Sequence, residues 1–336
     1  MSSRWRISFW RVALFGSLTG CGLVAGLPDW RLDTQAADGA AADGASKDGG
    51  VLEDARSLED GPMSADAADA DATGLVCDPL APFQPSKPLT ELNTSVLDIG
   101  ARFTADELTV YFGSDRLGGS PPNEQKIFFA KRTSLTAPFG TPVPAPELDV
   151  PNFGEYSPTL TEDGLTLFLT LYDGTPSIYA STRASTSLPF STPQAVPSMS
   201  NLFHPYVTQP GLRLLVTNGQ TISEAVLASP TQAPTSFTPV PFTGIPSGGF
   251  QIPVMSADRK TFYGTNNGLI WRSHRVSDAV PFPAPVVVPE LNEANANNGA
   301  LYLSADNCRI YLGRITAANG PDLFVAERAK TVPGSD

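Results

Sequence analysis

The chain has 336 residues, a net charge of -12 and an isoelectric point near 4.6, with only three cysteines and two histidines. The sequence contains no basic patch, so nucleic acid is not an expected partner. Too few Cys and His residues are present for a zinc site, and we predict no metal, cofactor or spanning helix.

The first 20 residues predict a secretory signal peptide, since arginines precede an apolar run too short to cross a bilayer. The run ends in Leu18-Thr19-Gly20-Cys21, which resembles the lipobox of bacterial lipoproteins. That resemblance implies cleavage before Cys21, lipidation of Cys21 and membrane attachment through lipid only. Gly22 in place of Asp implies the outer membrane. An ordinary signal peptide with a chance cysteine is the alternative.

Residues 21–33 form an anchor-proximal segment, and residues 34–76 predict a disordered tether. Ala, Asp and Gly dominate the tether, which has ten acidic residues, two basic residues and no aromatic residue. Such a segment cannot bury enough apolar surface to offset its ordering entropy. Calcium binding by its Asp-Gly pairs is the alternative, but the closing Glu of a calcium loop is absent.

A repeat of 47 to 57 residues follows, and it occurs five times. Each copy has an apolar run, a hydroxyl residue, a polar turn and a β-rich run; the hydroxyl residues are Thr104, Thr161, Thr208, Ser256 and Ser304. Two further recurring sequence segments follow in most copies of the repeat, so each repeat is expected to supply four short strands. This pattern predicts an all-β fold, a five-bladed β-propeller over residues 77–330 with four-stranded blades and a tail at 331–336.

The fifth repeat lacks its last strand, but a matching phrase lies before the first repeat. Residues 82–93 match residues 281–292, sharing a Pro-Phe start and a Glu-Leu-Asn end. We therefore expect this N-terminal strand to complete the last blade and close the ring, which removes exposed strand edges. Cys77 and Cys308 then lie on the same side of that blade, and a disulfide between them is predicted. Two unpaired cysteines are the alternative.

The phrases resemble the TolB-type, WD-repeat-like propeller repeats of bacterial envelope proteins. The motifs that carry the resemblance are Ser157–Phe168 and Ile178–Arg183, and the likeness covers about residues 93–328. It implies a propeller in the periplasm or at the cell surface. TolB itself has six blades and a separate N-terminal domain, so its role in the cell is not transferred.

Residues repeated in every blade are expected to belong to the scaffold, as we predict for Arg132, Arg183, Arg275 and Arg328. Function is then expected where blades differ, at the loops that enter the innermost strands. The candidate ligand-binding residues at this central mouth are Asp98, Glu155, Tyr156, His204, Gln251 and Asn298. Solvated loop ends are the alternative for this set. The sequence assigns no catalytic residue.

The sequence favours a lipid-anchored envelope binding or scaffold propeller, non-enzymatic and monomeric, whose partner is an envelope protein or a glycan. The alternative is a carbohydrate-active enzyme or lectin that uses the acidic residues of the mouth, because glycosidases use paired carboxylates. A purely structural envelope component is a third hypothesis.

Overall fold

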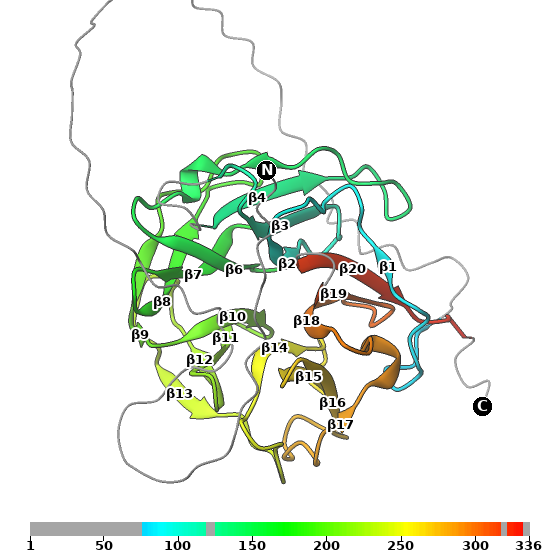
Figure 1. Cartoon of the computed structure of the whole chain (residues 1–336). Coiled ribbons are helices and arrows are strands. Elements are labelled where there is room, and N and C mark those ends of the chain that lie inside the picture. Colours follow the sequence, from blue (N-terminus) through cyan, green and yellow to red (C-terminus); the bar gives the residue numbers. More distant parts are fainter. Residues whose placement is uncertain (1–75, 119–124, 317–320, 332–336) are drawn as a thin grey trace, which may run out of the picture. The chain divides into compact units, whose positions relative to one another are not determined.

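The computed structural model describes residues 76–118, 125–316 and 321–331. These residues form five antiparallel four-stranded sheets arranged as blades around one axis (Figure 1). The structure confirms the all-β five-bladed propeller. This part of the chain includes no helix with the length and hydrophobicity required for a transmembrane span. The predicted signal peptide, tether and lipidation site at Cys21 lie outside the described residues.

The strands follow one another regularly along the chain. Blade 1 consists of β2 (Asp98–Phe103), β3 (Thr109–Ser114), β4 (Lys126–Lys131) and β5 (Val143–Pro144). Blade 2 consists of β6 (Gly154–Leu160), β7 (Thr166–Tyr172), β8 (Pro176–Thr182) and β9 (Gln194–Ser200). Blade 3 consists of β10 (Phe203–Thr208), β11 (Arg213–Thr217), β12 (Ile222–Val226) and β13 (Ser236–Pro239).

Blade 4 consists of β14 (Gln251–Met255), β15 (Thr261–Asn266), β16 (Leu269–His274) and β17 (Val286–Val287). Blade 5 consists of β18 (Asn297–Leu303), β19 (Arg309–Ile315), β20 (Pro321–Glu327) and β1 (Lys87–Pro88). Two short 3-10 turns, η1 (Pro146–Leu148) and η2 (Pro289–Leu291), follow blades 1 and 4.

The antiparallel order gives the propeller two distinct faces. Each innermost strand, β2, β6, β10, β14 or β18, begins on one face, which we call the mouth face. Each ends on the other, which we call the hairpin face, because the tight turn to the second strand lies there. The predicted mouth residues belong to the first face, and both cysteines of the disulfide belong to the second.

The turns of the hairpin face explain the repeated hydroxyl-x-Asp phrase. In blade 2 the Thr161 hydroxyl donates to Asp163 at 2.6 Å, and the same carboxylate accepts the Leu165 N–H at 2.9 Å. Side-chain bonds of this kind satisfy turn amides that no strand partner reaches. Equivalent hydroxyl–carboxylate bonds occur at Thr104, Ser256 and Ser304.

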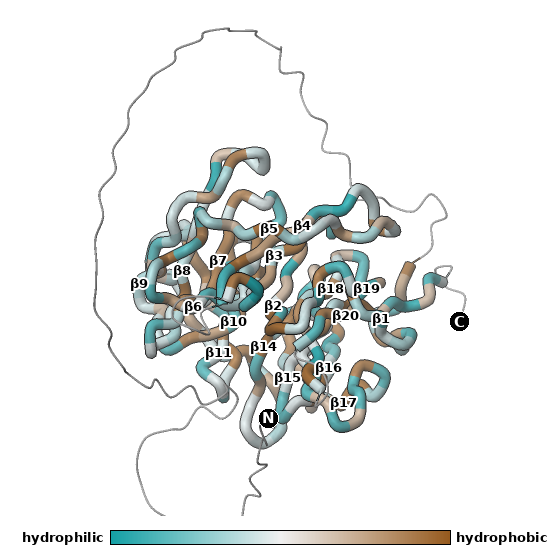
Figure 2. The backbone as a smooth tube through the Cα atoms, turned by 45° about the horizontal axis from the view of Figure 1, so that its top comes forward, coloured by the Kyte–Doolittle hydropathy of each residue, from teal (hydrophilic) through white to brown (hydrophobic). Residues whose placement is uncertain are grey.

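The hydrophobic core lies between neighbouring blades. Four buried clusters fill these spaces, and each draws side chains from at least two blades, as Phe103 of blade 1 and Tyr311 of blade 5 do. In Figure 2, hydrophobic residues recur along the strands of every blade, and many loop segments are hydrophilic. Blade-to-blade packing is therefore the main source of apolar burial.

An arginine at the end of the third strand links each of four blades to its surroundings, in an arrangement we call the arginine latch. Each guanidinium lies over the Phe ring that precedes the fourth strand of its own blade, at 3.7 to 4.5 Å from the ring centre. The pairs are Arg132–Phe139, Arg183–Phe190, Arg275–Phe282 and Arg328–Phe83. The repeated arginines thus serve the scaffold.

The latch also reaches the neighbouring blade. Arg132 donates to the Tyr311 hydroxyl at 2.9 Å, and Arg328 donates to the Tyr263 hydroxyl at 2.5 Å. Arg183 forms the corresponding bond with Tyr111. Blade 3, the neighbour of blade 4 on this side, has no such tyrosine. Arg275 of blade 4 instead donates to the Val280 carbonyl and pairs with an aspartate.

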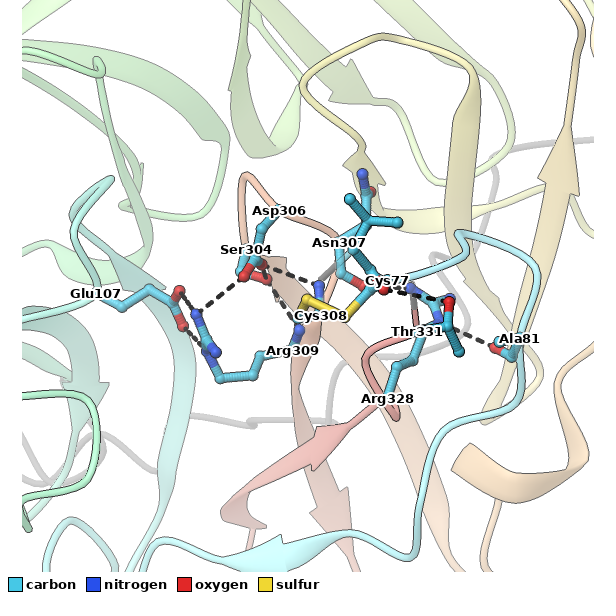
Figure 3. The surroundings of a disulfide bond; sticks show 11 residues. Cys77, Ala81, Glu107, Ser304, Asp306, Asn307, Cys308, Arg309, Arg328 and Thr331 are labelled. Atoms are coloured by element: carbon cyan, nitrogen blue, oxygen red, sulfur yellow. Dashed lines mark hydrogen bonds and ion pairs between the residues drawn. A yellow bond between two sulfur atoms is a disulfide. The ribbon is translucent and has the colours of Figure 1, made fainter. Parts of the chain in front are cut away.

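The ring closes as the sequence predicts, through the N-terminal strand. Lys87 and Pro88 pair with Val325 and Phe324 of β20, so β1 is the outermost strand of blade 5. Cys77 and Cys308 form a disulfide, with an S–S distance of 2.01 Å and a Cα–Cα distance of 5.3 Å (Figure 3).

Other contacts surround this closure. Val76 and Thr331 exchange two backbone hydrogen bonds of 2.9 and 2.8 Å next to the disulfide. In Figure 3, Arg309 reaches from blade 5 to Glu107 of blade 1, at 2.7 Å between its Nη2 and the carboxylate. The N-terminal segment that carries β1 and the C-terminal segment that carries β18 to β20 are therefore held together on the hairpin face.

Candidate functional site

The predicted mouth residues begin the innermost strands, but three of them are buried among their own partners. Asp98, Glu155 and Asn298 are at most 1% exposed. The sequence places them at equivalent positions of three blades, six residues before the hydroxyl anchors. Their side chains point into the blade contacts, so they lie behind the mouth surface.

Asp98 is the acceptor for a cation and two local donors. Arg116 approaches one carboxylate oxygen at 2.6 Å, and the amide and hydroxyl of Thr94 donate to the other at 2.7 Å. Burial first, and the negative charge of Asp98 second, raise the pKa of Asp115 and of Asp322. Asp98 therefore acts on two other carboxyl groups at the junction of blades 5 and 1.

Glu155 has a different environment on the next blade. Its carboxyl accepts the Ile127 N–H at 2.9 Å and the Val150 N–H at 3.2 Å, and Lys126 lies 3.3 Å away. Burial raises the pKa of Glu155 to about 7, against the lowering effect of these donors. Near neutral pH, Glu155 therefore carries a proton in a large fraction of molecules.

Asn298 fills the equivalent place in blade 5 and joins it to blade 4. Its side-chain amide donates to the Ala296 carbonyl at 3.2 Å and to the Gly268 carbonyl at 3.4 Å. Its oxygen accepts Arg314 Nε at 2.9 Å. The residue connects strand ends and leaves no group directed at the mouth.

Every innermost strand contains a β-bulge just inside the mouth, with one residue more than its partner strand. Four bulges place a residue in the left-handed region: Gly100, Ser157, His204 and Ile252 have φ of 68°, 49°, 50° and 42°. This conformation is costly for a residue other than glycine, and most costly for a β-branched one. Bulges and strained residues are over-represented next to functional sites, which supports the mouth as the candidate site.

The bulges bring Ser157 and His204 together from neighbouring blades. The serine Oγ and the histidine Nδ1 are 2.7 Å apart. Burial, and then the positive charge of Arg102, lower the pKa of His204 to about 4. The imidazole is consequently neutral at pH 7 and partly buried, which differs from the solvated loop end that was the alternative for this residue.

Partly exposed side chains one residue before the bulge form the rim of the mouth. Tyr156, Phe203 and Gln251 occupy this position in blades 2, 3 and 4. Phe203 lies beside the imidazole of His204, with 6.0 Å between ring centres. An aromatic and amide rim is suited to the apolar faces and hydroxyl groups of a polar ring-shaped ligand.

A separate pocket of about 240 Å³ lies on the mouth face between blades 3 and 4. Its lining is mostly apolar and includes Ile222, Phe242 and Ile245. None of the six predicted mouth residues contributes to it. No group of three or more His, Cys, Asp or Glu side chains within the described ranges is placed to share a metal ion.

Sequence reasoning selected Tyr156, His204 and Gln251, which the structure places at or just inside the rim. It missed Phe203 and Ser157, together with Arg102 below them. A signal for these three was present, because they lie five, four and two residues before the hydroxyl anchors of their blades. Reading all inner-strand positions blade by blade would have found them.

No family model matches this chain. A search of curated proteins likewise found no match. Solved structures do match: the GH43_1 enzyme from Xanthomonas citri complexed with xylotriose has a TM-score of 0.53 and 14% identity, over 75% of this chain and 94% of that one. The same enzyme without that ligand gives 0.52 and 13%, over 74% and 92%.

The structure of putative TolB from Agrobacterium tumefaciens gives a TM-score of 0.38 at 11% identity, over 70% of this chain and 79% of that one. At these identities, the likeness to the GH43_1 enzyme concerns the fold. The expectation of a non-enzymatic binding scaffold is nevertheless corrected, because solved structures with this fold include those of a GH43_1 enzyme, one of them complexed with xylotriose.

Proposed function

We propose that this chain is a carbohydrate-active enzyme that binds a glycan at the mouth of the propeller and hydrolyses a glycosidic bond there. The observation that carries the proposal is the contrast between two carboxyl groups on neighbouring blades. Burial raises the pKa of Glu155 to about 7, whereas Asp98 is paired with Arg116 at 2.6 Å. Pairs of carboxyl groups in contrasting environments supply the acid and the base or nucleophile of glycoside hydrolysis.

In this mechanism Glu155 is the general acid. Since its pKa lies near neutrality, it holds a proton that it can donate to the leaving oxygen of the glycosidic bond. Asp98 is the second carboxylate, the base that takes a proton from a water molecule as the water oxygen bonds to the anomeric carbon and the bond to the leaving oxygen breaks. Tyr156 and Phe203 hold the sugar rings. Both carboxyl groups are buried, so the proposal requires that glycan binding displaces the side chains covering them.

The test uses the full chain and a panel of oligosaccharides that includes xylotriose, with release of reducing ends as the readout. We expect release from at least one glycan, and a loss of about 100-fold or more in the Glu155→Gln variant. Glu224→Gln, a carboxyl on blade 3 away from the mouth, is the matched control and should retain activity. Absence of release from every glycan, or full activity in Glu155→Gln, contradicts the proposal.

A lectin is the second candidate, and one observation favours it. The oxygens of Glu155 already accept two backbone N–H groups, from Ile127 and Val150, so the rim could hold a glycan while no bond is cleaved. In that case Phe203→Ala lowers glycan affinity by about tenfold, equal to about 1.4 kcal/mol, while Glu155→Gln leaves it unchanged. Calorimetric titration of both variants with the same glycan measures this binding, and the release assay separates the two candidates, because a lectin binds the glycan without releasing reducing ends.

We further propose that the protein is a monomer of the bacterial envelope, attached to the outer membrane through a lipid on Cys21. The support is the sequence alone: charge, apolar run and lipobox-like motif precede this cysteine. Fractionation of cells expressing the full chain tests it. Wild type should partition with membranes and Cys21→Ser should not; equal partitioning of the two contradicts the anchor.

A further inference from the structure

Arg102 carries a buried positive charge on the axis of the propeller. It lies on β2 of blade 1 and is 1% exposed. Its guanidinium carbon is 5.3 Å from the centre of the Tyr206 ring, which belongs to β10 of blade 3. Because blades 1 and 3 are not neighbours, the side chain reaches across the central channel.

The hydrogen bonds of this guanidinium are incomplete. Nη1 donates to the Ala101 carbonyl at 3.0 Å, while Nε and Nη2 meet no acceptor among the described residues. The other buried arginines differ. Arg328, for example, donates to the carbonyls of Ala81, Asn307 and Pro79 and to a tyrosine hydroxyl. An unpaired buried charge costs several kcal/mol, which makes Arg102 an exception that needs a partner.

The neighbours of Arg102 on the axis supply no negative charge. Tyr206, whose ring lies against the guanidinium, donates its hydroxyl to the Met255 carbonyl. Burial lowers the pKa of Arg102 to about 10, so it remains a cation at neutral pH. Its charge also contributes to the lowered pKa of the nearby His204.

The carboxylates of the surrounding strands are occupied. Asp98 pairs with Arg116, and Glu107 pairs with Arg309. The two free nitrogens, Nε and Nη2, lie on the same edge of the guanidinium and present parallel N–H donors, the fork that binds a halide or one carboxylate. Because the side chain is 1% exposed, a ligand of this fork must itself be buried in the channel, which favours a small ion.

We propose that the Nε–Nη2 edge of Arg102 binds a small monovalent anion, a halide or a formate-sized carboxylate, inside the central channel. The anion neutralises the buried charge and joins blade 1 to the side chains of blade 3 across the axis. The site is separate from the proposed glycan site, and its test does not depend on enzymatic activity.

The first experiment measures the thermal midpoint of the full chain in sodium gluconate, then in mixtures with bromide, chloride or formate at constant ionic strength. We expect a saturable rise of about 5 °C at 100 times the dissociation constant, with no further rise from larger anions. Arg102→Met should remove the dependence. Arg314→Met, which changes a buried arginine with side-chain partners, is the matched control and should retain it.

The second experiment locates the ion in wild-type crystals grown in bromide, through its anomalous scattering. It keeps the proposal testable if Arg102→Met does not fold. A bromide peak within hydrogen-bonding distance of Nε and Nη2 supports the site, and separate formate soaks distinguish a halide from a carboxylate. A water molecule at this position in saturating bromide, or an equal halide response in folded Arg102→Met, overturns the proposal.

Discussion

Blades 3 and 5 differ in the contacts that hold their outer strands in place. Blade 5 has the complete arginine latch, with Arg328 over Phe83, and the disulfide between Cys77 and Cys308. In blade 3, Leu227 replaces the latch arginine, and Pro234 takes the place of the buried ring. The comparison indicates that the strongest cross-links lie where the ring must close, and that an internal blade can do without them.

Blade 3 compensates through ion pairs with blade 4. Glu224 accepts Arg213 at 2.9 Å and Arg259 at 2.7 Å, and Arg259 also pairs with Asp278 at 2.8 Å. These groups are partly exposed, and pairs of that kind contribute about 1 kcal/mol or less. We therefore expect blade 3 to be the less stable of the two blades.

The largest expected effect comes from removing the disulfide that only blade 5 has. Replacing Cys77 and Cys308 together by alanine should lower the free energy of unfolding by about 4 kcal/mol, since the bond closes a long loop. Urea denaturation of variant and wild type measures the difference, and wild type in reductant is the control. A loss below about 1 kcal/mol would show that the latch and strand pairing alone close the ring.

The next effect compares the mouth ends of blades 2 and 3, where Glu155 and His204 have pKa values shifted in opposite directions. Folding raises the pKa of Glu155 from 4.5 to about 7, so this group binds more protons in the folded state, and stability falls as pH rises between these values. Folding lowers the pKa of His204 from 6.5 to about 4, so this group makes stability rise over that range.

The two contributions oppose each other between pH 4.5 and pH 6.5, and only Glu155 acts between pH 6.5 and pH 7. Relative to wild type, Glu155→Gln should therefore gain stability as pH rises from 4.5, by about 3 kcal/mol at pH 8. Unfolding curves from pH 4 to pH 8 measure this change, with His204→Asn as the variant of opposite slope. A difference between Glu155→Gln and wild type that does not vary with pH would falsify the assignment.

A smaller effect is expected from the latch itself. Arg328→Met keeps the aliphatic contact with Phe83 but removes the donors to Tyr263 and three carbonyls, so we expect a loss of about 2 kcal/mol. Leu227→Met, at the same position of blade 3, conserves volume and should cost less than about 1.5 kcal/mol. Chemical denaturation of both variants checks the contrast. Equal losses would mean that the latch adds nothing to ordinary packing.

The smallest effect concerns the hairpin turns. Asp163→Ala removes the acceptor for Thr161 and Leu165 in blade 2 and should cost about 1 kcal/mol. The turn of blade 3 has Gln209 in that region, and Gln209→Ala should change stability by less than about 0.5 kcal/mol. Thermal melts of the two variants, read against wild type, test the difference; a reversed order would contradict the role given to the aspartate.

The sequence was sufficient for the architecture because its signals are local and repeated. The hydroxyl anchors fix the first hairpin in four of the five blades, and the match between residues 82–93 and 281–292 reveals the closing strand. Both signals follow from turn chemistry and strand length, which recur unchanged in most blades.

The mouth was harder to predict, for a physical reason. A bulge residue changes which side chains of the inner strand face the channel. Of the four residues in the left-handed region, only Gly100 is of a type from which a positive φ can be predicted. Ser157, His204 and Ile252 carry no such signature. Asp98 has its partner Arg116, and Glu155 its partner Ile127, in another strand or loop. The burial of these carboxyl groups could therefore not be predicted from the sequence of their own strands.

The closure of blade 5 has a consequence for how this fold can be rebuilt. Val76 and Thr331 are hydrogen-bonded to each other, so a short peptide could join these positions into a continuous backbone. New ends could then be opened in the turn of blade 3 at Gly211, where neither latch nor disulfide would be cut. A circularly permuted chain of this kind would move the chain ends from blade 5, which has both the latch and the disulfide, to blade 3, which has neither.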